Sequence, residues 1–168
     1  MQTSFLEREG TSSASANCDN IEKISHRFHL TNRKPPKTPL PSENLTHILP
    51  DTSPDHKAHP QLINHYQSLV GSIGFAAIMT RPDIAFAHQM LSQWLTKPER
   101  SHVIAAEQTI SYLYGTRYHS IEFNGSCDPE YVFRAASDAS FADNIRRKSS
   151  QGFIFTLFSS LINWLVRK

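Results

Sequence analysis

Apolar side chains recur every three or four positions through the middle of the chain, which is the period of a helix that buries one face. Three such runs predict helices over residues 64–79, 80–95 and 99–114. Their apolar positions are Tyr66, Leu69, Val70, Ile73 and Ala77 in the first run, Ile84, Ala87, Leu91, Trp94 and Leu95 in the second, and Val103, Ala106, Ile110 and Leu113 in the third. Packed helices are therefore expected in the centre of the sequence.

Glycine, threonine and proline residues mark features of these helices. Gly71 and Gly74 lower the helix propensity of the first run, which suggests that another backbone packs close to it. Thr80 can cap the second helix, and Pro82 fits its first turn, where no hydrogen bond is lost. Gly115 is suited to end the third helix.

After residue 118 the apolar period changes to two, which is typical of strands. Strands are predicted over residues 121–124, 131–137, 152–158 and 162–166. The segment 131–137 is apolar enough to be a central strand. The predicted fold class is α+β, with about three helices followed by the first three antiparallel strands of a sheet that stays incomplete.

The N-terminal third has a weaker pattern. Residues 1–20 are rich in Ser, Thr, Ala and Asn without an apolar period, which predicts disorder. A short helix is predicted over residues 21–30. Most prolines follow in a stretch that predicts an extended linker, because proline removes backbone donors and restricts its predecessor. The predicted organisation is a tail (1–20), a short helical unit (21–34), a linker (35–62), a helical segment (63–118) and a strand segment (119–168).

Composition adds few constraints. The formal net charge is +2, from 17 Lys+Arg against 15 Asp+Glu, which is too balanced to predict polyanion binding. Cys18 and Cys127 lie far apart, which argues against a disulfide framework and suits a reducing compartment such as the cytoplasm or nucleus. No apolar run reaches the ~20 residues of a membrane-spanning helix, so no membrane association is expected. The histidine pairs His26/His29 and His56/His59 have no cysteine pair nearby and predict no zinc site.

Four segments carry a family resemblance. In chain order they are IEKISHRFHLTNRKPPKTPLP (21–41), YQSLVGSIGFAAIMTRPDIAFA (66–87), HVIAAEQTISYLYGT (102–116), and SDASFAD with RKSSQG (137–143 and 147–152). Together they resemble copia-type retrotransposon Pol polyproteins. The resemblance implies that the first segment ends the reverse transcriptase core, that the helices form a thumb or connection, and that the last segment opens an RNase H domain.

The resemblance also implies a role for Asp138. In an RNase H fold the first carboxylate ligand of catalytic Mg²⁺ projects from the first strand, and Asp138 follows the predicted strand 131–137 directly. The competing interpretation is an ordinary strand-end or turn aspartate. After Asp138 the sequence contains one more acidic residue, Asp143, which is expected to pair with neighbouring basic residues or to contact solvent.

Two-metal phosphodiester hydrolysis needs several carboxylates around ions ~3.5–4 Å apart. By the resemblance, the remaining RNase H ligands belong to later elements, and the paired aspartates of the polymerase precede Ile21. No Asp–Asp dipeptide occurs in the sequence. The chain is therefore expected to have no catalytic activity in isolation and to bind no Mg²⁺ tightly, whereas the parent enzyme would use Mg²⁺ on an RNA–DNA hybrid or template–primer.

A second hypothesis is a non-catalytic nucleic-acid-binding module. Its candidate phosphate contacts are Arg81, Lys97, Arg100 and Arg117, with Trp94 and Tyr118 as candidate stacking groups. The plainer interpretation makes Trp94 a core residue and leaves the basic side chains in solvent. A scaffold for other proteins is a third hypothesis, and no motif supports it.

An unfinished sheet would leave one edge unpaired and one apolar face uncovered. The aromatic and aliphatic residues concerned are Phe153, Phe155, Phe158, Trp164 and Leu165. Self-association through this sheet is therefore expected.

Overall fold

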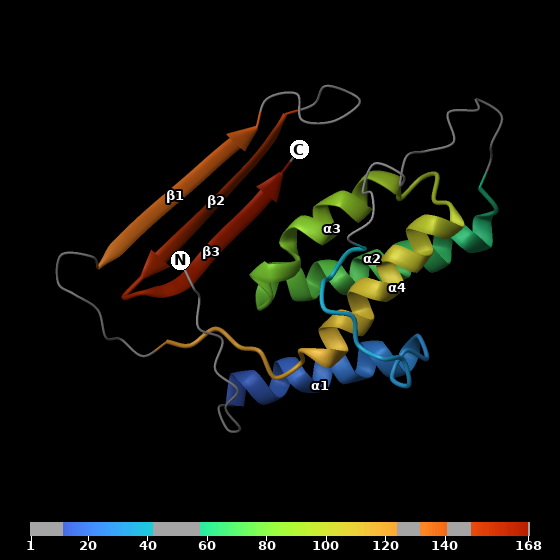
Figure 1. Ribbon diagram of the computed structural model, residues 1–168, viewed down its shortest axis with the longest axis horizontal. Coiled ribbons are helices and arrows are strands. Elements are labelled where there is room, and N and C mark those ends of the chain that lie inside the picture. The colour runs from blue at the N-terminus through green and yellow to red at the C-terminus, as the bar shows by residue number, and fades with distance from the viewer. Residues whose placement is uncertain (1–11, 42–57, 124–131, 141–148, 168) are drawn as a thin grey trace.

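The computed structural model describes residues 12–41, 58–123, 132–140 and 149–167. Within these ranges four α-helices precede one three-stranded antiparallel sheet (Figure 1), which confirms the predicted α+β class. The helices are α1 (Ser12–Arg27), α2 (Pro60–Met79), α3 (Ala85–Leu91) and α4 (Arg100–Gly115), with short 3-10 turns η2 (Pro82–Ile84) and η3 (Ser92–Trp94) around α3. The strands are β1 (Phe133–Ser140), β2 (Ser150–Leu157) and β3 (Ser160–Arg167).

The hydrophobic core lies among the helices. Apolar faces of α2, α3 and α4 meet there, and α1 and the chain after it add three buried residues, Ile21, Leu30 and Leu40. Tyr66 is fully buried and its hydroxyl donates to the Leu91 carbonyl at 2.8 Å, which ties α2 to the end of α3. The buried positions of α2 and α4 include every apolar position that the helical period picked out in those two runs.

Helix α1 differs from its predicted position. It begins at Ser12 and ends at Arg27, whereas the apolar pattern predicts a helix over residues 21–30 after a disordered tail. One polar contact reaches this earlier part, since Asn17 Oδ1 accepts a hydrogen bond from the Thr80 hydroxyl at 2.7 Å. An apolar period cannot reveal a helix end that is held by polar contacts. Thr80 itself ends α2 as its C-cap and caps no following helix.

In the described part of the proline-rich stretch, residues 37–40 form bends, and residues 60–62 of the predicted linker already belong to α2, which begins at Pro60. The first part of the stretch lies along α4. The Thr109 hydroxyl donates to the Pro39 carbonyl at 2.9 Å, and Leu40 is buried in the core. Residues 42–57 of the predicted linker lie outside the described residues.

The glycines act through contacts that the sequence pattern did not identify. A Cβ on Gly74 would lie 2.6 Å from the His88 ring, so Gly74 makes room for a side chain of α3 and not for a backbone. A Cβ on Gly71 would meet nothing within 4 Å. Gly115 is the last residue of α4, with Thr116 as its C-cap, and a Cβ there would lie 2.3 Å from Pro35 Cβ.

The strand order is β1-β2-β3, with both pairs antiparallel. Phe133 is opposite Leu157 in the first pair, and a bulge interrupts the second between Phe155 and Thr156. Among the described strands, β1 lies at one edge of the sheet, whereas its apolar residues suggested a central strand, and all eight of its residues are exposed. Residues 121–123, which are predicted to begin a strand, have no strand conformation, while Asn124 lies outside the described residues.

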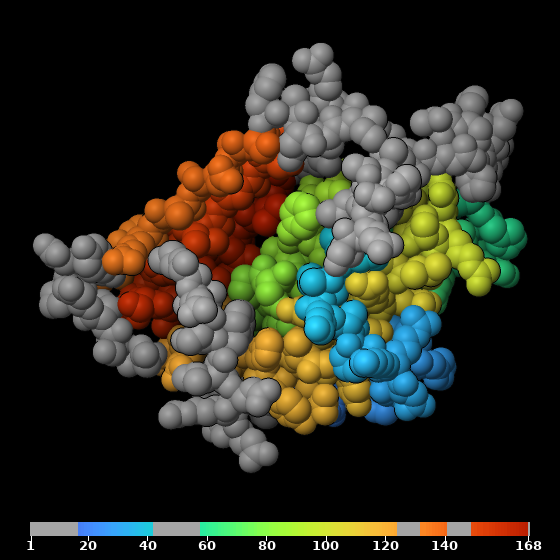
Figure 2. All heavy atoms as spheres, viewed as in Figure 1, coloured from blue at the N-terminus to red at the C-terminus, as the bar shows by residue number. Residues whose placement is uncertain are grey.

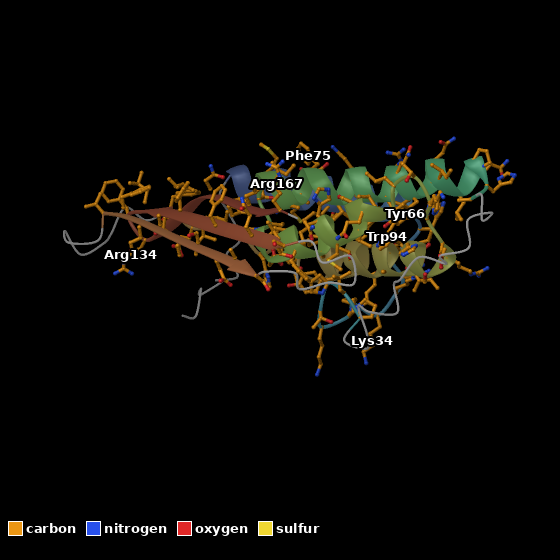
Figure 3. All side chains as sticks on the ribbon, turned by 90° about the horizontal axis from the view of Figure 1, so that it is seen from above. Lys34, Tyr66, Phe75, Trp94, Arg134 and Arg167 are labelled. Carbon is orange, nitrogen blue, oxygen red and sulfur yellow. The ribbon has the colours of Figure 1, made fainter. Side chains whose placement is uncertain are left out.

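The sheet lies beside the helices, with β3 as the strand nearest to them and β1 as the farthest (Figure 1). The Trp164 indole nitrogen donates to the Ala77 carbonyl at 2.7 Å and so joins β3 to α2. Viewed from above, the sheet and the helices form two adjoining parts, with Tyr66 and Trp94 inside the helical one (Figure 3). No helix in the described part of the chain is long and apolar enough to span a lipid bilayer.

Candidate functional site

Arg81 lies in the interior of the helical part, with its side chain 0% exposed. Its guanidinium makes two hydrogen bonds to the Asp83 carboxylate, at 2.9 and 2.7 Å. It also donates to the carbonyl and the hydroxyl of Thr116, at 2.9 and 2.6 Å. Because Thr116 is the C-cap of α4, the arginine supplies both a donor and a positive charge to the negative end of that helix.

Tyr112 completes this arrangement, which we call the Arg81 cluster (Arg81, Asp83, Tyr112 and Thr116). The tyrosine hydroxyl donates to Asp83 Oδ2 at 3.0 Å, and the Arg81 guanidinium carbon lies 5.7 Å from the ring centre. Burial acts to raise the pKa of the Asp83 carboxyl, but hydrogen bonds and charge from Arg81, with the Tyr112 hydroxyl, hold that pKa below its ordinary value. Burial and the Asp83 charge raise the pKa of Tyr112.

The Arg81 cluster joins two of the segments that carry the family resemblance. Arg81 and Asp83 belong to the Thr-Arg-Pro-Asp run, and Tyr112 and Thr116 belong to the Tyr-Leu-Tyr-Gly-Thr run at the end of α4. Arg81 was expected at the surface, as a phosphate contact or as a solvated base, and burial corrects that placement. Asp83, two residues after Arg81, is a local sequence signal that could have indicated a paired, buried arginine. The contact of Arg81 with Thr116, 35 residues away, leaves no such signal in the sequence.

The other three candidate phosphate contacts do not gather in one place. Lys97 and Arg100 are exposed; Arg100 is the first residue of α4, and Lys97 lies three residues before it in the sequence. Arg117 lies just beyond the other end of that helix, roughly 25 Å away by the rise of an α-helix. Its side chain pairs with Glu22 at 3.0 Å and lies 4.6 and 4.5 Å from the rings of Tyr114 and Tyr118. Of the four candidates, Lys97 and Arg100 are therefore the two that are exposed and close in sequence.

The two candidate stacking groups differ in accessibility. The Trp94 ring stacks on His102, with 4.9 Å between ring centres and 18° between planes, and His102 is fully buried. Trp94 thus packs against the helical core, which agrees with its interpretation as a core residue. Tyr118 is 50% exposed and remains accessible.

Asp138 lies within β1, two residues before its end, and does not follow the strand as predicted. It is exposed and is paired with Gly152 of β2, which places no side chain beside it. Asp143 lies outside the described residues. Within the described ranges, no three His, Cys, Asp or Glu side chains come together as a metal-binding group. The Mg²⁺ role of Asp138 stays a prediction.

Comparison with known proteins shows what the chain is similar to in sequence. Over 146 residues, 86% of this chain, it is 36% identical to the retrovirus-related Pol polyprotein from transposon TNT 1-94 of Nicotiana tabacum. It is 30% identical over 151 residues to the putative transposon Ty5-1 protein of Saccharomyces cerevisiae. It is also 33% identical over 104 residues to secreted RxLR effector protein 161 of Plasmopara viticola, and these are 61% of this chain and 72% of that relative.

The chain spans 11% of the tobacco polyprotein and 46% of the yeast protein. No family model and no solved structure matches it. The matches to the tobacco polyprotein and the yeast protein cover 86% and 89% of this chain. The chain is homologous to copia/Ty1-type retrotransposon Pol polyproteins.

Proposed function

We propose that this chain is the part of a copia-type Pol polyprotein where the reverse transcriptase region ends and an RNase H domain begins. The Arg81 cluster carries the proposal, because it gives a shared structural purpose to two of the resembling segments. The last of the four resembling segments begins with Ser137–Asp138–Ala139, which lie in the first strand of the antiparallel sheet that follows the helices. The parent protein would carry out RNA-directed DNA synthesis and degrade the RNA strand of RNA–DNA hybrids.

In this assignment the chain alone does not catalyse. Hydrolysis by two metal ions needs several carboxylates converging on one phosphate. Asp138 stands on an exposed edge strand opposite a glycine, so no side chain of the paired residue supports a second ligand there. Mg²⁺ prefers near-octahedral oxygen ligands, and one carboxylate supplies too few of them to hold the ion tightly. The α4 helix and the Arg81 cluster instead serve as a connection between two parts of the parent protein.

We expect the purified chain to release no fragments from an end-labelled RNA–DNA hybrid in the presence of Mg²⁺. The measurement is a gel assay of the labelled RNA strand, with an active ribonuclease H as the positive control. Hybrid cleavage by the wild-type chain that Asp138→Asn abolishes and Asp143→Asn leaves intact would contradict the proposal. Cleavage that both variants retain would point to a contaminating nuclease.

The alternative function is non-catalytic binding of nucleic acid, and the exposed pair Lys97 and Arg100 is the observation that favours it. The two residues are three positions apart in the sequence at the N-terminal end of α4. Arg117 forms an ion pair with Glu22 and packs on two tyrosine rings, and Arg81 is buried. Neither side chain is therefore placed to contact a phosphate together with Lys97 and Arg100. A basic pair of this size would give weak binding that depends strongly on salt.

If the chain binds a hybrid duplex, Lys97→Gln/Arg100→Gln is expected to reduce the slope of log K against log salt by about 2, since each lost phosphate contact removes about 0.9. Fluorescence anisotropy over a range of salt concentrations measures this slope. Lys34→Gln/Lys37→Gln is the matched control, because both of these side chains are also exposed and carry the same charge. Undetectable binding at low salt, or an equal effect of both double variants, would exclude the alternative.

A further inference from the structure

The C-terminal end of α2 is held by side chains from three other parts of the fold. The Thr80 hydroxyl donates to a side chain of α1, and the Arg81 guanidinium donates to the C-cap residue of α4. The indole nitrogen of Trp164, in β3, donates to the Ala77 carbonyl at 2.7 Å. The helix α1, the end of α4 and the sheet therefore meet at one short stretch of backbone, residues 77–81.

The Ala77 carbonyl receives no backbone donor from the turn that follows α2. The amides of Thr80 and Arg81 both donate to the preceding carbonyl, that of Ala76, at 3.1 and 2.8 Å, and Pro82 has no amide hydrogen. The last carbonyls of an α-helix need partners from outside the helix. The indole from β3 supplies that partner, so a side chain of the sheet caps the helix.

The surroundings make this hydrogen bond difficult to replace. Ala77 is 2% exposed, so loss of the indole would leave its carbonyl with neither a protein donor nor free access to water, which is unfavourable. Trp164 is held on its own side by pairing with Ile154 of β2. Because a hydrogen bond is directional, a donor fixed in the sheet and an acceptor fixed in α2 constrain both the distance and the angle between these two parts.

Apolar packing leaves part of this joint open. A cleft of about 320 Å³ lies beside Trp164, between the end of α2, β3 and the segment after α4. On its α2 side, Ile78 and Met79 are 69% and 58% exposed. Figure 2 shows the strands and the helices as neighbouring parts, with the red atoms of β3 next to the green atoms of α3. Since side chains do not fill the cleft, packing alone does not fix the angle between sheet and helices there.

We propose that Trp164 is a positioning residue, whose hydrogen bond to Ala77 fixes the orientation of the sheet against the helices. In the parent protein, this bond would set how the RNase H domain lies relative to the reverse transcriptase region, and to that extent the proposal rests on the proposed function. The Arg81 cluster begins four residues after Ala77, so the bond attaches the sheet to the same stretch of backbone that joins α2 to α4.

Exchange of the indole hydrogen tests the contact in the unaltered chain. The sequence contains two tryptophans, so a ¹⁵N-labelled chain gives two indole N–H signals, and replacing either Trp94 or Trp164 by phenylalanine assigns both. We expect the Trp164 indole hydrogen to exchange with solvent at least roughly tenfold more slowly than in free tryptophan, because its hydrogen bond must open first. Exchange at the rate of free tryptophan overturns the proposal.

Distances between two spin labels test the orientation. Labels on Ser101→Cys in α4 and Gln151→Cys in β2, both at exposed positions, report the separation of helices and sheet in a Cys18→Ser/Cys127→Ser background. Pulsed electron paramagnetic resonance is expected to give one narrow distance distribution for this chain. Adding Trp164→Phe, which keeps an aromatic ring but has no donor, is expected to broaden the distribution without changing the helix content measured by circular dichroism.

The matched control is Trp94→Phe, which removes the other indole from within the helical part and is expected to leave the distribution narrow. A broad distribution in the presence of Trp164, no broadening by Trp164→Phe, or equal broadening by both substitutions overturns the proposal. If Trp164→Phe loses helix content, exchange of the wild-type indole hydrogen decides. These measurements involve no nuclease activity, so cleavage of a hybrid would refute the proposed function and leave the role of Trp164 to be judged separately.

Discussion

Arg81→Met is expected to lower the free energy of unfolding by about 3 kcal/mol, because removing one partner of a buried ion pair leaves the other charge uncompensated. The cost is at the lower end of the range for such changes, since the Asp83 side chain keeps 18% of its exposure. Thr116 also loses its donor, so the end of α4 is weakened along with the start of α3. Urea denaturation followed by circular dichroism measures the change.

The matched control is Arg100→Met, which removes the same side chain from an exposed position and is expected to change stability by less than about 0.5 kcal/mol. If the two variants unfold at the same urea concentration, the Arg81 cluster is not a significant source of stability. Arg81→Lys separates charge from geometry, because lysine keeps the charge but cannot make the paired hydrogen bonds to Asp83 and Thr116. We expect it to recover only part of the loss.

The Arg81 cluster also predicts that the free energy of unfolding falls at acidic pH, because the pKa of Asp83 is lowered in the folded protein. The pKa of Asp83 is lower in the folded protein than in the unfolded chain, so the unfolded chain binds the proton more readily. The stabilisation from this carboxylate is therefore fully present above its unfolded pKa of about 3.9 and is lost as the pH falls through the folded value. Asp83→Asn removes this contribution, so its stability should change less than that of the wild type over the acidic range.

The sequence predicts the helical part well because the signal is local. One period of apolar residues marks the buried faces of α2 and α4, and the same side chains form the core. Polar contacts between distant residues leave no such trace. Asn17 and Thr80 are 63 residues apart, and their hydrogen bond accompanies a helix that begins earlier than any apolar pattern indicates.

The sheet shows a different limit. The residues of β1 alternate as strand residues do, but whether a strand is central or at an edge depends on which neighbours pair with it. Phe133 is apolar and yet 59% exposed, and β1 has β2 on one side and no described strand on the other. The environment of Asp138 likewise depends on which strands pair with β1. The sequence places it near the first strand, but its exposure and its pairing with Gly152 come only from the register.

Gly115→Ala is expected to destabilise the protein by about 1–3 kcal/mol, as overpacked positions do. The new Cβ would lie 2.3 Å from Pro35 Cβ and 2.9 Å from its Cγ, and a proline ring cannot rotate away as a flexible side chain can. The strain is relieved when the segment after α1 moves off α4. That movement would break the hydrogen bond from Thr109 to Pro39 and expose Leu40, so the clash is linked to part of the core.

Gly71→Ala is the control that separates the clash from the general effect of adding a methyl group to a helix. Gly71 is exposed within α2, and its Cβ would meet nothing within 4 Å. Alanine is favoured over glycine inside a helix by roughly 0.5–1 kcal/mol, so this variant should be more stable than the wild type. Urea denaturation should thus give changes of opposite sign for the two substitutions. If Gly115→Ala is also neutral or stabilising, the segment at Pro35 does not pack against α4 in solution. Leu40, which belongs to the same segment, would then not be buried either.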